Sequence, residues 1–354
     1  MTTTTASGAV RASAPASVRR APLRLRETVL LGAVLLALLI AAAVLSLTVG
    51  ARATSLGTVW DALAAPEAGN GDHAVVGSRI PRTIAGLLVG AALGLAGAAM
   101  QGIARNPLAD PGILGVNAGA ALAVVLGIYL LGVASISGYI WFAFAGAAAA
   151  SVLVYLVASL GREGATPLKL ALAGAALAAG LASVMNAVLM MSDQALDSFR
   201  FWQVGTLGVR TIAETGQVFP FLLVGATVTL FSARLLNGLA LGDDAARGLG
   251  IRVGWARAAA AVGVVLLCGG ATALAGPIGF VGLVVPHAVR TLVGGDYRKI
   301  LPLAALAGPV LLLLADVAGR VVLPPSEVQV GVMTALIGAP VFIWLIRRGK
   351  RVAL

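Results

Sequence analysis

Long apolar stretches separated by short polar segments dominate the pattern of hydrophobic and polar positions along this chain. A helical run of about 18 to 25 apolar residues is long enough to cross a hydrocarbon core of roughly 30 Å. Ten stretches of about this length occur, at residues 28–50, 83–103, 112–133, 140–160, 167–191, 216–236, 253–275, 277–292, 301–322 and 331–346. The pattern therefore predicts an all-α polytopic membrane protein with about ten transmembrane helices.

Composition excludes a soluble globular protein. Of the 354 residues, 59% are hydrophobic and only 11% are charged, and the mean hydropathy is +0.99. Soluble domains carry about 25% charged residues. We therefore interpret the ten apolar stretches as membrane spans in contact with a lipid bilayer.

The placement of Lys and Arg predicts which way the chain is threaded, because cytoplasmic segments are enriched in these residues. If the N-terminus is cytoplasmic, 19 of the 25 Lys and Arg residues lie inside. The six on the outer side are Arg52, Arg79, Arg82, Arg200, Arg210 and Arg320. We therefore expect both termini in the cytoplasm, and the net charge of +11 indicates topology rather than nucleic-acid binding.

Three regions follow from this topology. Residues 1–27 form a Thr-, Ser-, Ala-, Pro- and Arg-rich cytoplasmic tail that we expect to be disordered. Residues 28–348 form a single transmembrane domain, and residues 349–354 form a cytoplasmic C-terminus.

A charged segment interrupts the apolar pattern at residues 241–250. It predicts a short polar helix with a glycine at each end and two acidic residues, Asp243 and Asp244, at its positive N-terminus. Asp243 and Arg247 lie one helical turn apart, a spacing that permits an ion pair. A helix of about two turns is marginal alone in water, so another contact must stabilise it.

The chain lacks the residues that most enzyme chemistry requires. It contains no phosphate-binding loop, since its only Gly-Lys pair, Gly349-Lys350, is followed by arginine. His73 and His287 are the only histidines, and no cluster of residues suits a metal ion. The sequence therefore predicts no catalytic residue and no bound cofactor, and any ATP must be used on another chain.

Ion-coupled transporters usually place ionisable residues within their spans. Only Asp316 is a clear case here, and Arg320 lies one turn further along. We expect these two residues to form an intrahelical pair near a helix end. A secondary transporter driven by an ion gradient is therefore disfavoured but not excluded.

Small residues and helix-end signals refine the spans. Gly90, Gly94 and Gly97 would let helices approach closely. The helix-end signals are Asp110-Pro111, Thr166-Pro167, the capping-box spacing of Ser326 to Gln329, Pro277 at the start of the eighth span and Pro286 as a bend within it. Cys268 lies within a span, where we expect it to serve packing.

A weak internal repeat relates residues 90–99 to residues 269–278, which agree at five of ten positions. Chance in a chain this rich in Ala and Gly is one explanation. If the repeat is genuine, its two copies run in opposite directions, as inverted repeats of transporters do.

Several motifs in one order resemble the permease subunits of ABC importers for iron–siderophore complexes, haem and cobalamin, the FecCD/BtuC type. The matching stretches are Arg79-Ile80-Pro81-Arg82; residues 97–101 and 106–115; Trp202 with residues 205–207; residues 241–250; residues 276–287; residues 314–316 with Arg320; and residues 327–331 and 338–345. The resemblance covers roughly residues 28–348 and implies the type II ABC importer permease fold.

The resemblance implies a set of partners and sites. It implies a second permease subunit, identical or a paralogue, two ABC ATPase subunits that hold ATP and Mg²⁺, and an extracytoplasmic solute-binding protein. It makes residues 242–249 an ATPase-coupling helix, with Gly242, Asp243, Asp244, Ala245, Arg247, Gly248 and Leu249 as its matched residues. It makes Arg79, Arg82 and Arg320 outward arginines that meet carboxylates of the binding protein, although interfacial placement or the pair with Asp316 would also explain them.

A translocation pathway is less clearly marked. Met100, Gln101, Asn106 and Asn117 lie near the second and third spans and could face it, or could cap helices or pack. His287 fits a structural role better. The expected function is ATP-driven import of an iron(III)–siderophore complex across the bacterial cytoplasmic membrane, with cobalamin or haem as alternative cargo.

Overall fold

The computed structural model describes residues 24–133, 135–161, 165–208, 210–324 and 326–351, and every regular element within them is helical. The longer elements are α1 (Leu25–Thr48), α3 (Gly71–Ile103), α4 (Val116–Leu131), α5 (Ile136–Ser159), α6 (Pro167–Met190), α8 (Ile212–Phe231), α11 (Val253–Ala275), α12 (Val281–Val293), α13 (Tyr297–Val322) and α14 (Val330–Arg351). The short ones are α2 (Leu56–Ala64), the 3₁₀ helix η1 (Pro111–Leu114), α7 (Asp193–Gln203), α9 (Ala233–Ala240) and α10 (Asp243–Gly248).

Each of the ten predicted spans overlaps one of the longer helices, and the span of residues 216–236 also includes the start of α9. Within the described residues, seven helices are long and apolar enough to cross a membrane, and the apolar segments of α4, α12 and α14 are shorter. At about 1.5 Å per residue, the 13 residues of α12 rise only about 20 Å. The chain is an all-helical polytopic membrane protein with seven to ten apolar helices.

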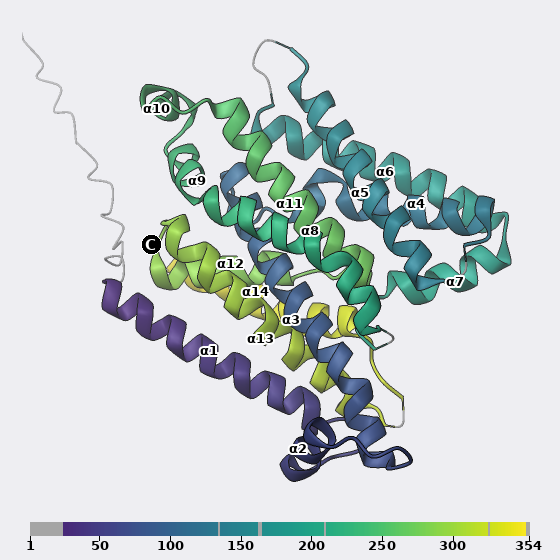
Figure 1. Cartoon of the computed structure of the whole chain (residues 1–354). Coiled ribbons are helices and arrows are strands. Elements are labelled where there is room, and N and C mark those ends of the chain that lie inside the picture. The colour runs from purple at the N-terminus through teal and green to yellow at the C-terminus, as the bar shows by residue number, and fades with distance from the viewer. Residues whose placement is uncertain (1–23, 134, 162–164, 209, 325, 352–354) are drawn as a thin grey trace, which may run out of the picture.

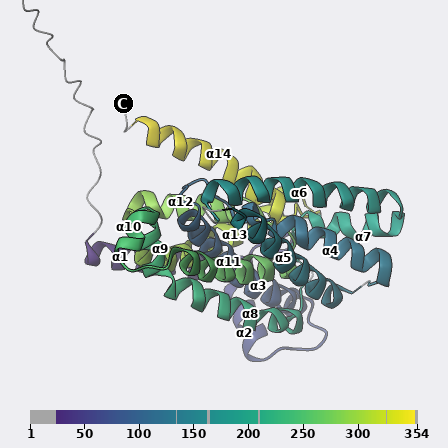
Figure 2. The same cartoon turned by 90° about the horizontal axis from the view of Figure 1, so that it is seen from above.

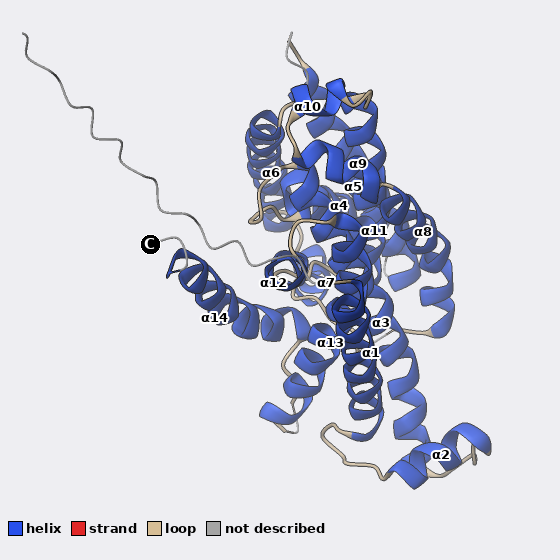
Figure 3. Ribbon diagram, turned by 90° about the vertical axis from the view of Figure 1, so that its left-hand side faces the viewer, coloured by secondary structure: helices blue, strands red, loops and turns tan. Residues whose placement is uncertain are grey.

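Helix α3 forms the centre of the bundle (Figure 1). It packs against α13, α11 and α12, whereas α4, α5 and α6 form a second group that joins α3 mainly through α11. Its 33 residues make it about 50 Å long, longer than a bilayer core. Its N-terminal part therefore projects toward α2, and Figure 3 places α2 and α10 at opposite ends of the molecule.

Close contacts confirm the expected role of the small residues of α3. A Cβ on Gly94 would lie 2.3 Å from the carbonyl oxygen of Ala304 in α13. A Cβ on Gly97 would lie 1.9 Å from the carbonyl oxygen of Gly282 in α12. The backbones of α3, α12 and α13 can approach this closely only because side chains are absent there.

The chain is not helical between α11 and α12, which corrects the expectation that Pro277 opens a span. Residues 276–280 connect the two helices, and α12 begins only at Val281. Gly276 and Phe280 adopt φ values of 75° and 68°, a conformation that is rare for a bulky residue such as Phe. The backbone N–H of Thr206 donates to the carbonyl of Ala275, the last residue of α11, at 2.8 Å.

The predicted helix ends divide into confirmed and corrected cases. Asp110 accepts a hydrogen bond from the Gly112 amide at 2.8 Å, and Thr166 accepts one from the Lys169 amide at 3.3 Å, each before a proline at the first helical position. Ser326 does not cap the last span, because α14 begins four residues later, at Val330.

Two helices were not predicted, α2 and α7, and α9 begins inside the predicted span of residues 216–236 but runs beyond it. They are short, and α7 carries a polar face, so none resembles an apolar span. The predicted tail at residues 1–27 falls largely outside the described residues, although residues 25–27 already belong to α1. The C-terminal segment from residue 349 begins within α14.

Both ends of the described chain lie on the α10 side of the bundle. The C-terminal turn of α1 contacts α3 near α2, since Ser46 of α1 bonds to Thr83 of α3. Arg105, just after α3, contacts Asp243 of α10, so α3 runs from the α2 end to the α10 end. Helix α14 starts beside Gly205, near the end of α11, and lies along the outside of the bundle (Figure 2).

Candidate functional site

Helix α10 is held by two arginines at the ends of the central helices α3 and α11. Asp243, at its first position, accepts a hydrogen bond from Arg105 Nη2 at 2.7 Å. It also accepts two from Arg257 Nη2, at 2.8 Å and 3.1 Å. Arg105 follows α3 and Arg257 belongs to α11, so one carboxylate joins α10 to the two most buried long helices.

The predicted pairing within this segment is therefore corrected. Arg247 pairs with Asp244 at 3.0 Å rather than with Asp243, because the Asp243 side chain turns inward. Gly242 has a φ of 102° and Gly250 a φ of 78°, values that favour glycine and confirm the expected turns at both ends. The contact that stabilises this short helix is provided by its own chain.

The opposite face of α10 is exposed. Asp244, Ala245, Arg247, Gly248 and Leu249 are all exposed, whereas Ala246 is completely buried beneath them. The Leu249 side chain is 65% exposed. The helix thus presents a mixed polar and apolar surface while its buried side is fixed.

At the α2 end, Arg82 connects three segments. Its guanidinium forms a fork with Asp316 of α13, with contacts of 2.9 Å from Nε and 2.9 Å from Nη2. Its Nη1 donates to Glu327 at 2.7 Å, in the loop before α14. Asp316 is buried and Glu327 is partly exposed, so this network extends from the interior to the surface.

Arg79 has a different set of partners. Its Nη1 donates to the Leu47 carbonyl at 2.9 Å and to Thr54 Oγ1 at 3.2 Å, and its Nη2 donates to the Arg52 carbonyl. A cation at the last turn of α1 satisfies carbonyl groups that have no partner within the helix. Arg79 thus holds the turn that follows α1.

Arg320 is also internal. It is 2% exposed, and its guanidinium donates to the carbonyl and the hydroxyl of Ser46 at 2.9 Å and 3.1 Å. Its Nε lies 3.3 Å from Asp316 Oδ2, which confirms the predicted intrahelical pair. The structure brings all three predicted arginines together at the α2 end, but Arg79 and Arg320 do not present their guanidinium groups outward.

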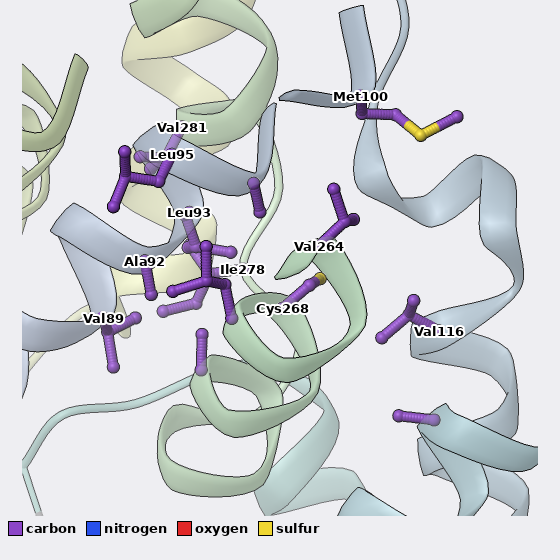
Figure 4. Packing of buried hydrophobic residues seen from close by; sticks show 14 of the residues in the cluster. Val89, Ala92, Leu93, Leu95, Met100, Val116, Val264, Cys268, Ile278 and Val281 are labelled. Atoms are coloured by element: carbon purple, nitrogen blue, oxygen red, sulfur yellow. The ribbon is translucent and has the colours of Figure 1, made fainter. Parts of the chain in front are cut away.

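The four predicted pathway residues are not brought together on one surface. Met100 is completely buried in the core (Figure 4). Gln101 is buried and donates to the Leu283 carbonyl of α12 at 3.2 Å, while its Oε1 has no hydrogen-bond partner among the described residues. Packing and backbone satisfaction explain these two residues.

Asn106 and Asn117 lie apart from that pair. Asn106 is exposed in the loop after α3 and its side chain accepts the Leu108 amide at 2.9 Å, forming a local turn. Asn117 of α4 accepts a hydrogen bond from Thr272 of α11 at 3.1 Å.

Two other residues have packing roles, as expected. Cys268 of α11 is a free thiol buried in the hydrophobic core (Figure 4). His287 lies against Phe342 of α14, with ring centroids 6.0 Å apart. Among the described residues, no group of three or more His, Cys, Asp or Glu could hold a metal ion.

A solved structure identifies the class of protein. The structure, described as an inward-facing metal-chelate type ABC transporter, matches this chain with a TM-score of 0.78 and 30% sequence identity. The match covers 90% of this chain and 98% of that chain. The helices and their order are thus those of an ABC importer permease, the subunit that spans the membrane and does not itself act as an enzyme.

The sequence comparisons define the family. The model of the FecCD transport family matches residues 38–348. The chain is 47% identical over 318 residues to the ferric enterobactin transport system permease protein FepD of Escherichia coli K12, covering 90% of this chain and 95% of that protein. It is 41% identical, with the same coverage, to the siderophore transport system permease protein YfiZ of Bacillus subtilis 168. The chain belongs to the FecCD transport family.

Proposed function

We propose that this permease moves an iron(III)–siderophore complex across the bacterial cytoplasmic membrane by alternating access, with ATP hydrolysed on a separate subunit. The names of the similar FepD and YfiZ proteins support this class of cargo. The observation that carries the mechanism is Asp243, which fixes α10 to α3 and α11 while the outer face of the helix stays exposed.

The proposal places α10 and both termini in the cytoplasm. The excess of Lys and Arg at that side supports this orientation. The α2 end then faces outward and carries the network of Arg79, Arg82 and Arg320.

In this orientation α10 is the surface on which an ATPase subunit docks. Its exposed residues, including Asp244 and Arg247, supply polar contacts and Leu249 supplies an apolar one. A displacement of α10 would pass through Asp243 to Arg105 and Arg257, and so to the helices that fill the centre of the permease. Coupling thus requires both a free outer face and a fixed inner one.

Docking of the solute-binding protein centres on Arg82 in this proposal. Its guanidinium is the one of the three that also contacts a partly exposed carboxylate, Glu327. A carboxylate of the binding protein would take the place of Glu327 on Arg82, and Asp316 would keep the guanidinium oriented. Arg79 and Arg320 support this site by fixing α1 against α3 and α13.

The assembly comprises a second permease subunit, two ATPase subunits and the binding protein. The pathway lies where the two permeases meet, and the four residues discussed above are not assigned to it. This chain needs no bound cofactor for its part of the cycle.

The cargo is tested by growth and uptake. A strain that lacks this permease is grown under iron limitation with single siderophores, and uptake of radiolabelled iron is measured. Loss of uptake for one siderophore class, restored by the intact gene, is the expected result. Normal uptake of every siderophore together with loss of haem or cobalamin uptake would refute the cargo assignment.

A further inference from the structure

A polar cavity of about 540 Å³ lies beside α10, between the first turn of α11 and the end of α5. Among the residues that the structure describes, three arginines line it, Arg247, Arg252 and Arg257, together with one acidic side chain, Asp243. Arg105 and Arg257 already share the Asp243 carboxylate. The described lining therefore carries an excess of positive charge, which suits an anion.

One of these cations is built into the protein. The Arg257 side chain is only 5% exposed, and it donates to the Ala165 carbonyl at 2.8 Å as well as to Asp243. Its Nε is buried and has no hydrogen-bond partner among the described residues.

An apolar groove of about 230 Å³ continues from the cavity along α5 and α11. Tyr155 borders both spaces, and Val152, Leu156 and Val262 give the groove exposed apolar walls. Its α11 wall runs from the turn after Arg257 to Leu266, about 14 Å at 1.5 Å per residue. That length is close to one leaflet of a hydrocarbon core roughly 30 Å thick.

The residues around the junction of cavity and groove are of the kind expected at a membrane boundary. Trp255, in the first turn of α11, is 74% exposed, as aromatic side chains at the headgroup level often are. The Arg252 side chain is exposed at the position just before this helix and offers no capping oxygen, so the first amides of α11 have no side-chain cap. A charged pocket above an apolar groove at this depth matches the two parts of a phospholipid.

We propose that the cavity and groove together bind one anionic phospholipid of the leaflet on the α10 side. Its phosphate contacts Arg252, Arg257 and the first turn of α11, and one acyl chain lies in the groove between α5 and α11. Because Arg257 also bonds to Asp243, the bound lipid stabilises the contact that fixes α10 to α11. The site is independent of the cargo and goes beyond the proposed transport function.

Lipid retention by the complete transporter tests the site. The complex with its ATPase is reconstituted with phosphatidylglycerol and phosphatidylcholine, and tightly held lipid is measured by native mass spectrometry, with glycerol 3-phosphate as a soluble headgroup probe. We expect about tenfold preference for phosphatidylglycerol and weak binding of glycerol 3-phosphate. Equal retention of the two lipids, or equally tight binding of the soluble probe, would overturn the proposal.

Two exposed positions allow substitution without disturbing the fold. Arg252→Gln should weaken phosphatidylglycerol binding about fivefold, the contribution expected of one interfacial arginine. Val262→Trp should block the groove and weaken lipid binding while leaving the soluble probe unaffected.

Arg298→Gln removes one exposed charge at the same end of the bundle, outside the cavity, and should match the wild type. The site is wrong if both test variants behave like this control. It is also wrong if the permease alone retains the lipid and the complex does not, because the ATPase would then fill the cavity.

Discussion

The inward turn of Asp243 is the residue-scale feature that most changes the interpretation of the charged segment. Spacing along the chain suggested Arg247 as its partner, since four residues span one helical turn. The observed partners, Arg105 and Arg257, come from two other segments of the bundle. Local spacing can propose a pair within a helix, but it carries no information on which charges the fold brings to its inner side.

The same limit applies at Arg82. The sequence marked it as an arginine on the disfavoured side of the membrane. Its partner Asp316 is separated from it by 234 residues, so only the packing of α3 against α13 reveals the pair. The Asp316–Arg320 pair, in contrast, lies within one helix and was predictable from spacing.

Substitution of Asp243 should uncouple the transporter. Asp243→Asn leaves the buried Arg257 without its carboxylate, at a cost of about 3 kcal/mol. We expect a lower unfolding temperature and less transport per ATP hydrolysed by the reconstituted complex. Asp244→Asn is the control for stability, because that side chain is 99% exposed and its pair contributes at most about 1 kcal/mol. Equal unfolding temperatures for the two variants would contradict the anchoring role.

Glu327 provides the test of the docking arginine. If a carboxylate of the binding protein replaces Glu327 on Arg82, Glu327→Gln removes a competitor and should tighten docking two- to fivefold, the effect of a partly exposed pair. Affinity of the binding protein for the complex in nanodiscs measures this. Asp72→Asn removes an exposed acid at the same end that pairs with Arg52, and should change nothing. Docking that is unchanged or weaker in Glu327→Gln would remove Arg82 from the interface.

At the scale of elements, hydrophobic length predicted the spans because burial in lipid requires about 20 apolar residues. The boundaries of α11 match the predicted span of residues 253–275. Helix α3 begins 12 residues before its predicted start, because its first turns are polar and leave the membrane yet remain helical. Helices α2 and α7 were missed, since a short helix at the surface has no apolar run to mark it.

Close packing of α3 makes a sharp prediction at this scale. Gly97→Ala would place a methyl group 1.9 Å from the Gly282 carbonyl, so α12 must move away. We expect the free energy of unfolding to fall by roughly 1 to 3 kcal/mol, and transport to be slower. Gly77→Ala is the matched control on the same helix, because its Cβ would meet nothing within 4 Å. The control should stabilise α3 by up to about 1 kcal/mol. Thermal unfolding of both variants in detergent measures this difference. Equal unfolding temperatures would contradict the close contact of α3 with α12.

For the whole molecule, the fold places α2 and α10 at opposite ends and both described chain ends on the α10 side. Antiparallel packing of α3 and α11 also agrees with the direction expected of an inverted repeat. Charge counting predicted which end faces the cytoplasm, and the surfaces proposed to contact partner subunits are exposed in this chain.

Cysteine labelling tests the orientation. Cys268 is buried, so Cys268→Ala gives a background without a native thiol. In that background, and in cells that lack the ATPase subunit, Ala68→Cys should react with a membrane-impermeant maleimide added to spheroplasts, and Ala245→Cys should react only after permeabilisation. Both positions are exposed in the structure. The reverse labelling pattern would place α10 outside.

In the proposed mechanism, this permease uses ATP hydrolysis on a partner subunit to import a ferric siderophore. The most direct measurement is uptake of a radiolabelled iron(III)–siderophore complex into proteoliposomes that contain the complete transporter, with the binding protein present and ATP on the ATPase side. We expect uptake that requires both ATP and the binding protein and falls sharply in Asp243→Asn. Uptake that persists without ATP and follows an imposed ion gradient would contradict it.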